Sequence, residues 1–351
     1  MTKQRTVLGL SAGSGISLFP FKESCSIIGN IELRTDFRIG GKPLQFKLNF
    51  PKALAGTSPT GYLELPDSPD IIMSQPKCGN SSVLALSRGK KKTSHLGDPS
   101  LDLVLRGINH LLPKVFLIEN LPDLLKTYSK EDLQEHFNLY RLNFIIGSVS
   151  LFGNSQLTRK RLVITGVLKS IKHSKRIHAA LQYPTRVREI QNTQSLLENA
   201  PTNGAFIPPI NEQIAIYGGR QMIYLEIQQY WQDNPFASRW VTPEENFSTA
   251  PGVYRDLPNK PPLTIRKSNR CFNPQGYTYS PRERARIQGI PDNFLICDPE
   301  MYPNLSPKTL FNKGCAAVTQ GPPYEIGLWF FKTLRAVNFI KLPRKQQDRL
   351  S

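Results

Sequence analysis

The chain has 351 residues, of which 39% are hydrophobic, so it can bury a sizeable core and is predicted to form two domains. Its formal net charge of +18 favours a polyanionic partner such as nucleic acid, although the charge could also serve solubility alone. Five widely spaced cysteines without a Cys-x-x-Cys pair argue against a disulfide framework and a structural zinc site, and we expect no metal. We see neither a signal peptide nor an apolar run of the roughly 18 residues that span a membrane, and therefore expect an intracellular, cytoplasmic protein.

The first predicted strand, residues 6–10, runs into a turn of small residues, Ser11-Ala-Gly-Ser-Gly15. Gly13 and Gly15 allow the backbone to bend tightly and to approach a ligand closely. The next apolar segment ends in Glu32, about 20 residues after the glycines, where an acid binds ribose hydroxyls in Rossmann-like folds. Each feature alone is weak evidence for a nucleotide-type site. The turn also fits an ordinary connection between a strand and a helix, and Glu32 also fits an exposed acid at the end of a strand.

A buried strand at residues 70–74 stops at Pro76 and is followed by Cys78 in an irregular loop. In an open α/β sheet, reactive groups gather in the loops after the strands, and a thiol there can act as a nucleophile. An inert buried cysteine is the alternative. A basic run follows, which is either a solvated face or a phosphate contact: Arg88, Lys90, Lys91 and Lys92.

The following segments continue the alternation of helix and strand. An amphipathic helix is predicted after Asp98, with an apolar stripe formed by Leu101, Leu105, Ile108, Leu111 and Leu112. A strand at residues 114–118 ends in Glu119-Asn120, which places Glu119 on the same sheet edge as Cys78. A helix at about 129–138 and strands at 142–151 and 162–168 follow, with Arg159 and Arg161 before the last strand.

From Lys169 onward the alternation stops, and Pro and Gly become frequent. We interpret residues 168–275 as an inserted, irregular, β-rich basic domain, with candidate DNA contacts at Lys172, Lys175 and Arg176. Regular structure returns at Ser280, where Ser280 and Glu283 form a capping box before a helix that ends at Gly289. A helix at 324–337 is predicted last. The domains are therefore 1–167, 168–275, 276–342 and a basic tail, 343–351.

In this order, the segments resemble the motifs of the DNA cytosine-5 methyltransferase family. Ser11–Gly15 is similar to the glycine motif that binds S-adenosylmethionine, and Glu32 to its ribose-binding acid. The segment from Asp70 to Ser82 is similar to the strand and Pro-Cys loop of the nucleophile. Three further segments resemble the Glu-Asn-Val, Gln-x-Arg-x-Arg and Thr-x-Arg-Glu-x-Ala-Arg-Leu-Gln-Gly-Phe-Pro-Asp motifs: Glu119–Leu121, Arg159–Arg161 and Ser280–Asp292.

The resemblance implies an α/β fold, a Rossmann-like methyltransferase sheet with an inserted target-recognition domain. It implies methyl transfer from S-adenosylmethionine to C5 of a flipped-out cytosine in double-stranded DNA, as in restriction–modification systems, by a monomer. Cys78 would attack C6, Glu119 would act at N3, Arg161 would hold O2, and Arg159 would brace the loop or meet a phosphate. The cofactor-binding residues would be Ser11, Ala12, Gly13, Gly15, Glu32, Pro76 and Cys315.

The chain departs from the family motifs in four places, one of them the segment Gly79-Asn-Ser-Ser82 after Cys78, where the family usually has Gln-x-Phe-Ser. Lys77 replaces the Pro before the nucleophile, where a cation favours the thiolate or marks altered chemistry. Gln156 lies one residue too early for the Gln-x-Arg-x-Arg motif, and Cys315 stands where Gly-Asn-Ala-Val or Gly-Asn-Ser-Val has its Asn. These departures fit a divergent, even viral, member acting in the host cytoplasm. They also leave an alternative, a catalytically impaired relative that binds DNA as a specificity or partner protein.

Overall fold

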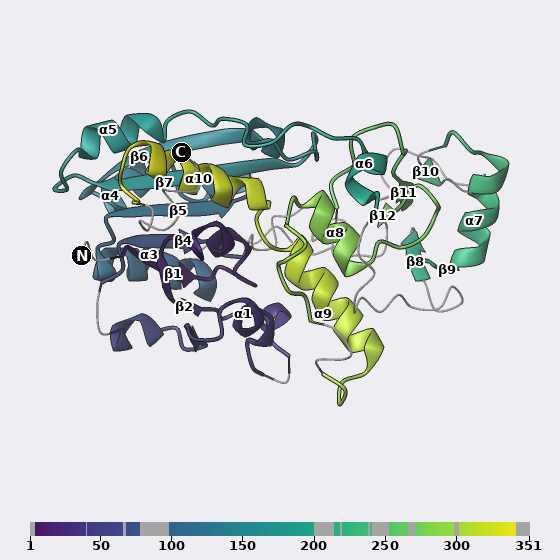
Figure 1. Ribbon diagram of the computed structural model, residues 1–351, viewed down its shortest axis with the longest axis horizontal. Coiled ribbons are helices and arrows are strands. Elements are labelled where there is room, and N and C mark those ends of the chain that lie inside the picture. The colour runs from purple at the N-terminus through teal and green to yellow at the C-terminus, as the bar shows by residue number, and fades with distance from the viewer. Residues whose placement is uncertain are drawn as a thin grey trace, which may run out of the picture.

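The computed structural model describes residues 4–39, 41–65, 68–77, 98–199, 214–217, 220–237, 239–240, 253–265, 271–297 and 302–341. They form a seven-stranded sheet flanked by helices and a smaller lobe beyond it (Figure 1). The predicted α/β class is confirmed. The strands of the sheet are β1 (Thr6–Leu10), β2 (Ser26–Ile31), β3 (Leu54–Gly56), β4 (Ile71–Ser74), β5 (Val115–Asn120), β6 (Tyr140–Ser148) and β7 (Lys160–Leu168).

The strand order is β3-β2-β1-β4-β5-β7-β6. The first five strands of this order are parallel, so their carboxyl ends meet at one edge, whereas β7 runs antiparallel between β5 and β6. The edge strand β3 lies in a region that the sequence pattern predicts as loop, because three residues are too few to show a period.

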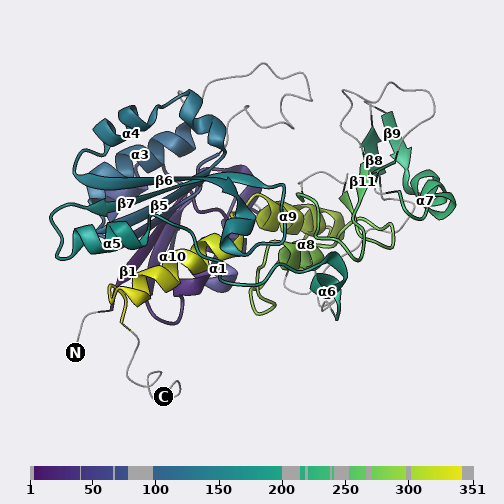
Figure 2. The same cartoon turned by 90° about the horizontal axis from the view of Figure 1, so that it is seen from above.

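Helices cover both faces of the sheet, which is why the central strands are apolar on both sides. One face carries α3 (Pro99–Leu111) and α4 (Lys130–His136), and the other carries α1 (Leu44–Asn49), α5 (Ser174–Ala180) and α10 (Tyr324–Ala336) (Figure 2). Short 3-10 helices complete these layers: η1 (Ile16–Phe21), η2 (Thr35–Phe37), η3 (Gly61–Glu64), η5 (Pro122–Lys126) and η6 (Val149–Phe152).

Helix α3 begins as predicted, with the Asp98 side chain accepting from the backbone N–H groups of Ser100 and Leu101. Its predicted apolar stripe is buried except at Leu112. Leu112 is 42% exposed, because it caps the helix with a left-handed backbone (φ 46°) and its side chain leaves the stripe. No helix in the described ranges is long and apolar enough to cross a bilayer.

The smaller lobe contains short elements, joined to the sheet by two helices. Its elements are α6 (Thr193–Leu197), β8 (Ile214–Tyr217), β9 (Arg220–Ile223), α7 (Tyr224–Asp233), β10 (Arg239–Trp240), β11 (Val253–Arg255) and β12 (Cys271–Phe272). Between it and the sheet lie α8 (Pro281–Ile287) and α9 (Pro307–Thr319) (Figure 1). The predicted capping box of α8 is confirmed: Ser280 and Glu283 each accept from the other's backbone N–H.

Packing changes later in the chain than the predicted boundary at residue 168. Ile177 and Leu181 lie in the core beneath the sheet, and Val187 packs against it. A separate cluster joins Ile265 and Tyr279 to Ile287 of α8. Helix α5, which follows the predicted boundary, therefore packs on β6 and β7.

Candidate active site

The carboxyl ends of four neighbouring strands bring several of the predicted site residues together. Leu10 of β1 pairs with Ile31 and Ser74, and Ser74 pairs with Ile118. Consequently the glycine turn, Glu32, Pro76 and Glu119 all follow strands that end side by side. Cys78 and the basic run of Arg88, Lys90, Lys91 and Lys92 lie outside the described residues.

The glycine turn after β1 is a tight, pinned loop. Ser11, Gly13 and Gly15 have φ values of 57°, 63° and 86°, a conformation that favours glycine. Asn30 of β2 accepts from the Ala12 N–H (3.2 Å) and donates to the Gly13 carbonyl (2.9 Å). Sequence reasoning missed Asn30, although an amide in an otherwise apolar strand is a signal that a buried polar group has a partner.

Glu32 lies beside this turn, as the spacing predicts, but it has an unexpected partner. The Gly13 N–H donates to its Oε2 at 2.7 Å. Arg34 donates to the same carboxylate through its backbone N–H, Nε and Nη2, each at 2.8 Å. The Glu32 side chain is only 1% exposed, so this ion pair is shielded from water.

The described residues at this edge fit S-adenosylmethionine. Buried polar atoms without a hydrogen-bond partner in the described part of the chain include Ser11 Oγ, Ser74 Oγ and Gln75 Oε1, which lie at the carboxyl ends of β1 and β4 or directly after them. Such atoms are rare in folded proteins and indicate a ligand or water. The tight glycine turn and these polar atoms together offer a backbone cradle and hydrogen-bonding groups for an adenosyl amino acid.

Glu119 and Arg161 form a buried ion pair. Arg161 Nε lies 2.6 Å from Glu119 Oε1, and the two side chains are 15% and 1% exposed. The antiparallel register of β5 and β7 causes this contact, since Glu119 pairs with Val163 near the start of β7. Within the described ranges, no donor makes a well-aligned hydrogen bond to the Glu119 carboxylate, which leaves it available to a substrate group.

Two neighbours hold the segment that leads to Cys78. Asn120 Nδ2 donates to the Pro76 carbonyl at 3.3 Å, and the Lys77 N–H donates to Ser100 Oγ at 2.8 Å. Strand β5 and helix α3 therefore fix the backbone on either side of the Pro76–Lys77 bond. The Lys77 side chain is exposed.

Arg159 is buried in the protein interior. It is 2% exposed, and its Nη2 donates to the Gly321 carbonyl at 3.3 Å. Of its two predicted roles, bracing a loop fits this buried position.

The Cys315 thiol is buried in α9 near Arg284, and burial raises its pKa. Two carbonyls at the end of α9 contact the loops after β1 and β4: Ser14 Oγ donates to the Ala317 carbonyl (2.8 Å) and Gln75 Nε2 to the Gln320 carbonyl (2.6 Å). The contacts use backbone atoms, so side-chain identity in the motif could not reveal them.

Gln156 connects the two lobes. It is fully buried, donates to Gln288 Oε1 at 3.0 Å and accepts from the Ile265 N–H at 2.9 Å. Gln156 lies one residue too early for the family motif, and in this position it holds the two lobes together.

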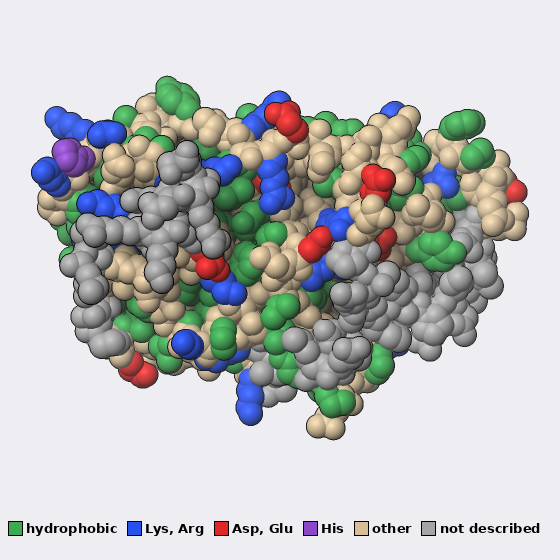
Figure 3. Space-filling model, viewed as in Figure 1, with side chains coloured by type: hydrophobic (Ala, Val, Ile, Leu, Met, Phe, Trp, Pro, Cys, Tyr) green, Lys and Arg blue, Asp and Glu red, His purple; other side chains and the backbone are tan. Residues whose placement is uncertain are grey.

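The structure does not bring Lys172, Lys175 and Arg176 to the site. They follow the carboxyl end of β7, where the Leu168 N–H donates to the carbonyl of Lys114 at the start of β5. Because β7 is antiparallel, this is the sheet edge opposite the site. Figure 3 shows Lys, Arg and His side chains gathered at that end of the molecule, around α5. As DNA contacts, these three residues stay a prediction.

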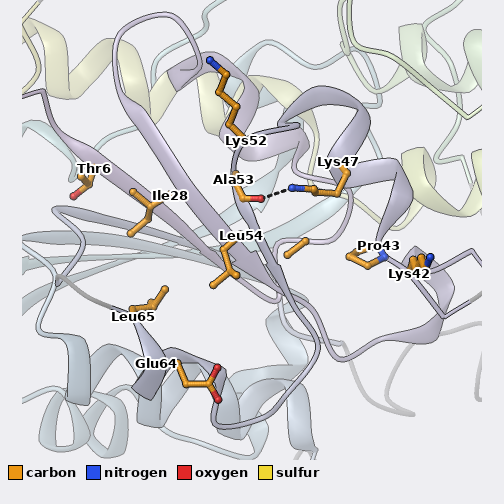
Figure 4. A pocket seen from close by; sticks show the side chains of 11 residues that line it. Thr6, Ile28, Lys42, Pro43, Lys47, Lys52, Ala53, Leu54, Glu64 and Leu65 are labelled. Atoms are coloured by element: carbon orange, nitrogen blue, oxygen red, sulfur yellow. Dashed lines mark hydrogen bonds between the residues drawn. The ribbon is translucent and has the colours of Figure 1, made fainter.

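A cavity of about 900 Å³ lies beside β3 and is separate from the site (Figure 4). Ile28, Leu54 and Leu65 contribute apolar walls, and Lys47 at its margin donates to the Ala53 carbonyl at 2.8 Å. None of the predicted site residues lines this cavity. In the described part of the chain, no group of three or more His, Cys, Asp or Glu side chains could hold a metal ion.

The family model of the C-5 cytosine-specific DNA methylases matches residues 46–302. The chain therefore belongs to this family: it is a DNA cytosine-5-methyltransferase, and its methyl donor is S-adenosylmethionine. A search of curated proteins found no match.

Solved structures of methyltransferases share the fold. A DNA modification methyltransferase encoded within an E. coli prophage aligns over 95% of this chain and 99% of its own, with a TM-score of 0.59 and 17% identity. The S. pombe Dnmt2 methyltransferase aligns over 96% and 100%, with a TM-score of 0.58 and 13% identity. The Entamoeba histolytica methyltransferase EhMeth aligns over 96% and 99%, with a TM-score of 0.56 and 14% identity.

Proposed function

We propose that this methyltransferase modifies C5 of a flipped-out cytosine in double-stranded DNA through a covalent bond between Cys78 Sγ and C6. The observation that carries the proposal is the buried Glu119–Arg161 pair beside the backbone that leads to Cys78. A carboxyl group and a guanidinium at one strand end can together bind N3 and O2 of a pyrimidine. Because these atoms are inaccessible in a duplex, the base must leave the stack.

The proposed chemistry activates a carbon that is a poor nucleophile. The thiolate of Cys78 donates an electron pair to C6, and the C5–C6 π electrons shift toward N3, which takes a proton from Glu119. Arg161 stabilises the charge that develops at O2. S-adenosylmethionine would supply the electrophilic methyl group that C5 attacks, with S-adenosylhomocysteine as the leaving group. A base then removes the C5 proton, the bond from C6 to sulfur breaks to return the thiolate, and N3 returns its proton to Glu119.

The smaller lobe is proposed to read the target sequence. It is joined to the sheet domain through Gln156 and α8, beside the edge that holds Glu119. We place the sheet domain at about residues 1–187 with 280–342, target recognition between them, and the basic tail at 343–351. We further propose that the enzyme acts as a monomer.

Covalent trapping tests this proposal. We expect duplex DNA with 5-fluorocytosine at target sites to form a denaturation-resistant complex with the full-length enzyme and S-adenosylmethionine, because fluorine cannot leave C5 as a proton does. Cys78→Ala should form none, yet bind DNA within about tenfold of wild type, or about 1.4 kcal/mol. Bisulfite sequencing of DNA from expressing cells would supply the target sequence for the duplex.

The departure at Lys77 favours one rival, a DNA-binding relative with impaired catalysis. Tight DNA binding without a 5-fluorocytosine adduct, and without 5-methylcytosine in mass spectra of the product nucleosides, would support that rival. Lys77→Pro restores the family residue and provides the matched variant: appearance of the adduct only in this variant would assign the impairment to Lys77.

A further inference from the structure

We infer that Arg34 is a latch on the cofactor site: its guanidinium occupies the positions on Glu32 that the ribose hydroxyls need. This role rests on the proposed function of Glu32 as the ribose-binding carboxylate. The latch would make cofactor binding depend on a side-chain movement that the family motifs do not predict.

Hydrogen-bond capacity carries the inference. An ionised carboxylate offers about four acceptor positions, two on each oxygen. Glu32 Oε1 accepts from the backbone N–H and Nε of Arg34, and Oε2 accepts from the Gly13 N–H and from Arg34 Nη2. All four positions are therefore filled, and a ribose diol finds no acceptor on Glu32 in this conformation.

Of these four donors, only the two guanidinium N–H groups can move away from Glu32 while the backbone stays in place. The N–H groups of Gly13 and Arg34 belong to the backbone of the turns that place Glu32. The guanidinium stands on a rotatable side chain that is 10% exposed, so it borders solvent. Its departure would free one position on each carboxylate oxygen, which matches the two hydroxyls of a ribose.

Two further contacts keep the latch closed. Arg34 Nη2 also donates to the Ser11 carbonyl at 2.8 Å, so the guanidinium joins the glycine turn to Glu32. The guanidinium carbon lies 4.4 Å from the centre of the Phe37 ring, a favourable cation–π distance. Phe37 itself packs on the turn, because a Cβ at Gly13 would lie 2.9 Å from its ring.

The latch predicts that removing Arg34 strengthens cofactor binding. If about nine-tenths of the molecules are latched, the apparent affinity for the cofactor is lowered about tenfold. Calorimetric titration of full-length Arg34→Ala with S-adenosylhomocysteine should therefore give a dissociation constant about tenfold below that of wild type.

Arg38→Ala is the matched control. Arg38 Nη2 donates to the backbone carbonyl of Glu32 at 2.6 Å and leaves the carboxylate alone, so this variant should show no gain. A second control uses S-adenosylhomocysteine without its 2′ and 3′ hydroxyls. The gain should vanish with this analogue, since it has no diol to place on Glu32.

Unchanged or weaker binding of S-adenosylhomocysteine by Arg34→Ala would overturn the latch, as would a gain that persists with the dideoxy analogue. Should Arg34→Ala fail to fold, Arg34→Lys keeps a cation but loses the planar fork, and it should give an intermediate gain; no gain there would count equally against the latch. The measurement needs neither DNA nor Cys78. A gain for Arg34→Ala, together with failed trapping of the wild-type enzyme by 5-fluorocytosine, would uphold the latch and reject the covalent mechanism.

Discussion

Three buried carboxylates, Glu32, Glu119 and Asp256, differ in their partners, and the partners decide what each can do. Glu32 is saturated by a backbone turn and Arg34. Glu119 has one close cation and available oxygens. Asp256 accepts from Tyr279 Oη at 2.6 Å and from the Leu263 N–H at 2.9 Å, which holds two segments of the smaller lobe together.

Arg161 is expected to matter for catalysis more than for DNA binding. Its guanidinium lies against Glu119, so Arg161→Ala removes a preorganised cation where charge develops on the base. We expect the single-turnover methylation rate to fall about 10²- to 10³-fold, with DNA affinity changed by less than about tenfold. Arg106→Ala removes an exposed arginine paired with Asp102 on α3 and should leave the rate unchanged. An equal loss of rate and DNA affinity in Arg161→Ala would place it in DNA binding instead.

The Tyr279–Asp256 hydrogen bond should show a defined pH dependence. Burial raises the pKa of Asp256 from 3.8 to about 6, so between these values the folded state holds a proton that the unfolded state has lost. The contribution of this group to stability is therefore full below about pH 4 and falls as the pH rises through 6. Since the Tyr279 hydroxyl lowers the pKa by stabilising the carboxylate, its loss costs more when Asp256 is ionised.

Tyr279→Phe should lower the free energy of unfolding by about 1–3 kcal/mol at pH 8, and by less at pH 5. Urea unfolding at the two pH values measures the difference. Tyr183→Phe, at a side chain that is 69% exposed, is the control. A larger loss at pH 5 than at pH 8 would show that the bond does not act through the ionised carboxylate.

At the scale of elements, the direction of β7 places Arg161 at the site and Lys172, Lys175 and Arg176 at the opposite end of the sheet. Its amino end carries Arg161 to Glu119, and its carboxyl end carries the chain to α5 at the opposite edge. A single antiparallel strand thus assigns two basic groups, close in sequence, to different ends of the sheet.

The end of α8 is a second element-level feature, because it packs on α10. Gly289 has a φ of 69°, and a Cβ there would overlap the carboxylate of Glu325. Glu325 is buried, Asn154 Nδ2 donates to it at 2.9 Å, and burial raises its pKa. Little space remains for a side chain at residue 289.

Gly289→Ala should lower the free energy of unfolding by at least about 2 kcal/mol more than Gly41→Ala, because it adds a clash to the strain of a left-handed backbone. Gly41 has a similar φ of 78°, but a Cβ there would meet nothing within 4 Å. Denaturant unfolding of both variants separates packing from backbone strain. Equal losses would mean that Glu325 moves aside at little cost.

At the scale of the whole molecule, Lys172, Lys175 and Arg176 follow the end of β7 that lies opposite the site. Replacing Lys172, Lys175 and Arg176 together with Gln should leave the salt dependence of DNA binding nearly unchanged. If all three contacted phosphates, the slope of log K against log salt would fall by about 2.7. Fluorescence anisotropy with a target duplex at several salt concentrations measures the slope. A fall of that size would show that DNA also reaches the far edge.

Features that depend on neighbouring residues follow from the sequence alone. The capping box of α8, the glycine turn, the apolar period of α3 and the strand ends at Glu32 and Glu119 are local, because cap bonds, backbone conformation and side-chain period extend over a few residues. Which distant groups meet depends on the folded chain. Arg34 closes on Glu32, Arg161 reaches Glu119, and the carbonyls of residues 317 and 320 contact Ser14 and Gln75. These contacts follow from strand order, strand direction and helix packing, which are set by burial of the whole core and not by any single segment.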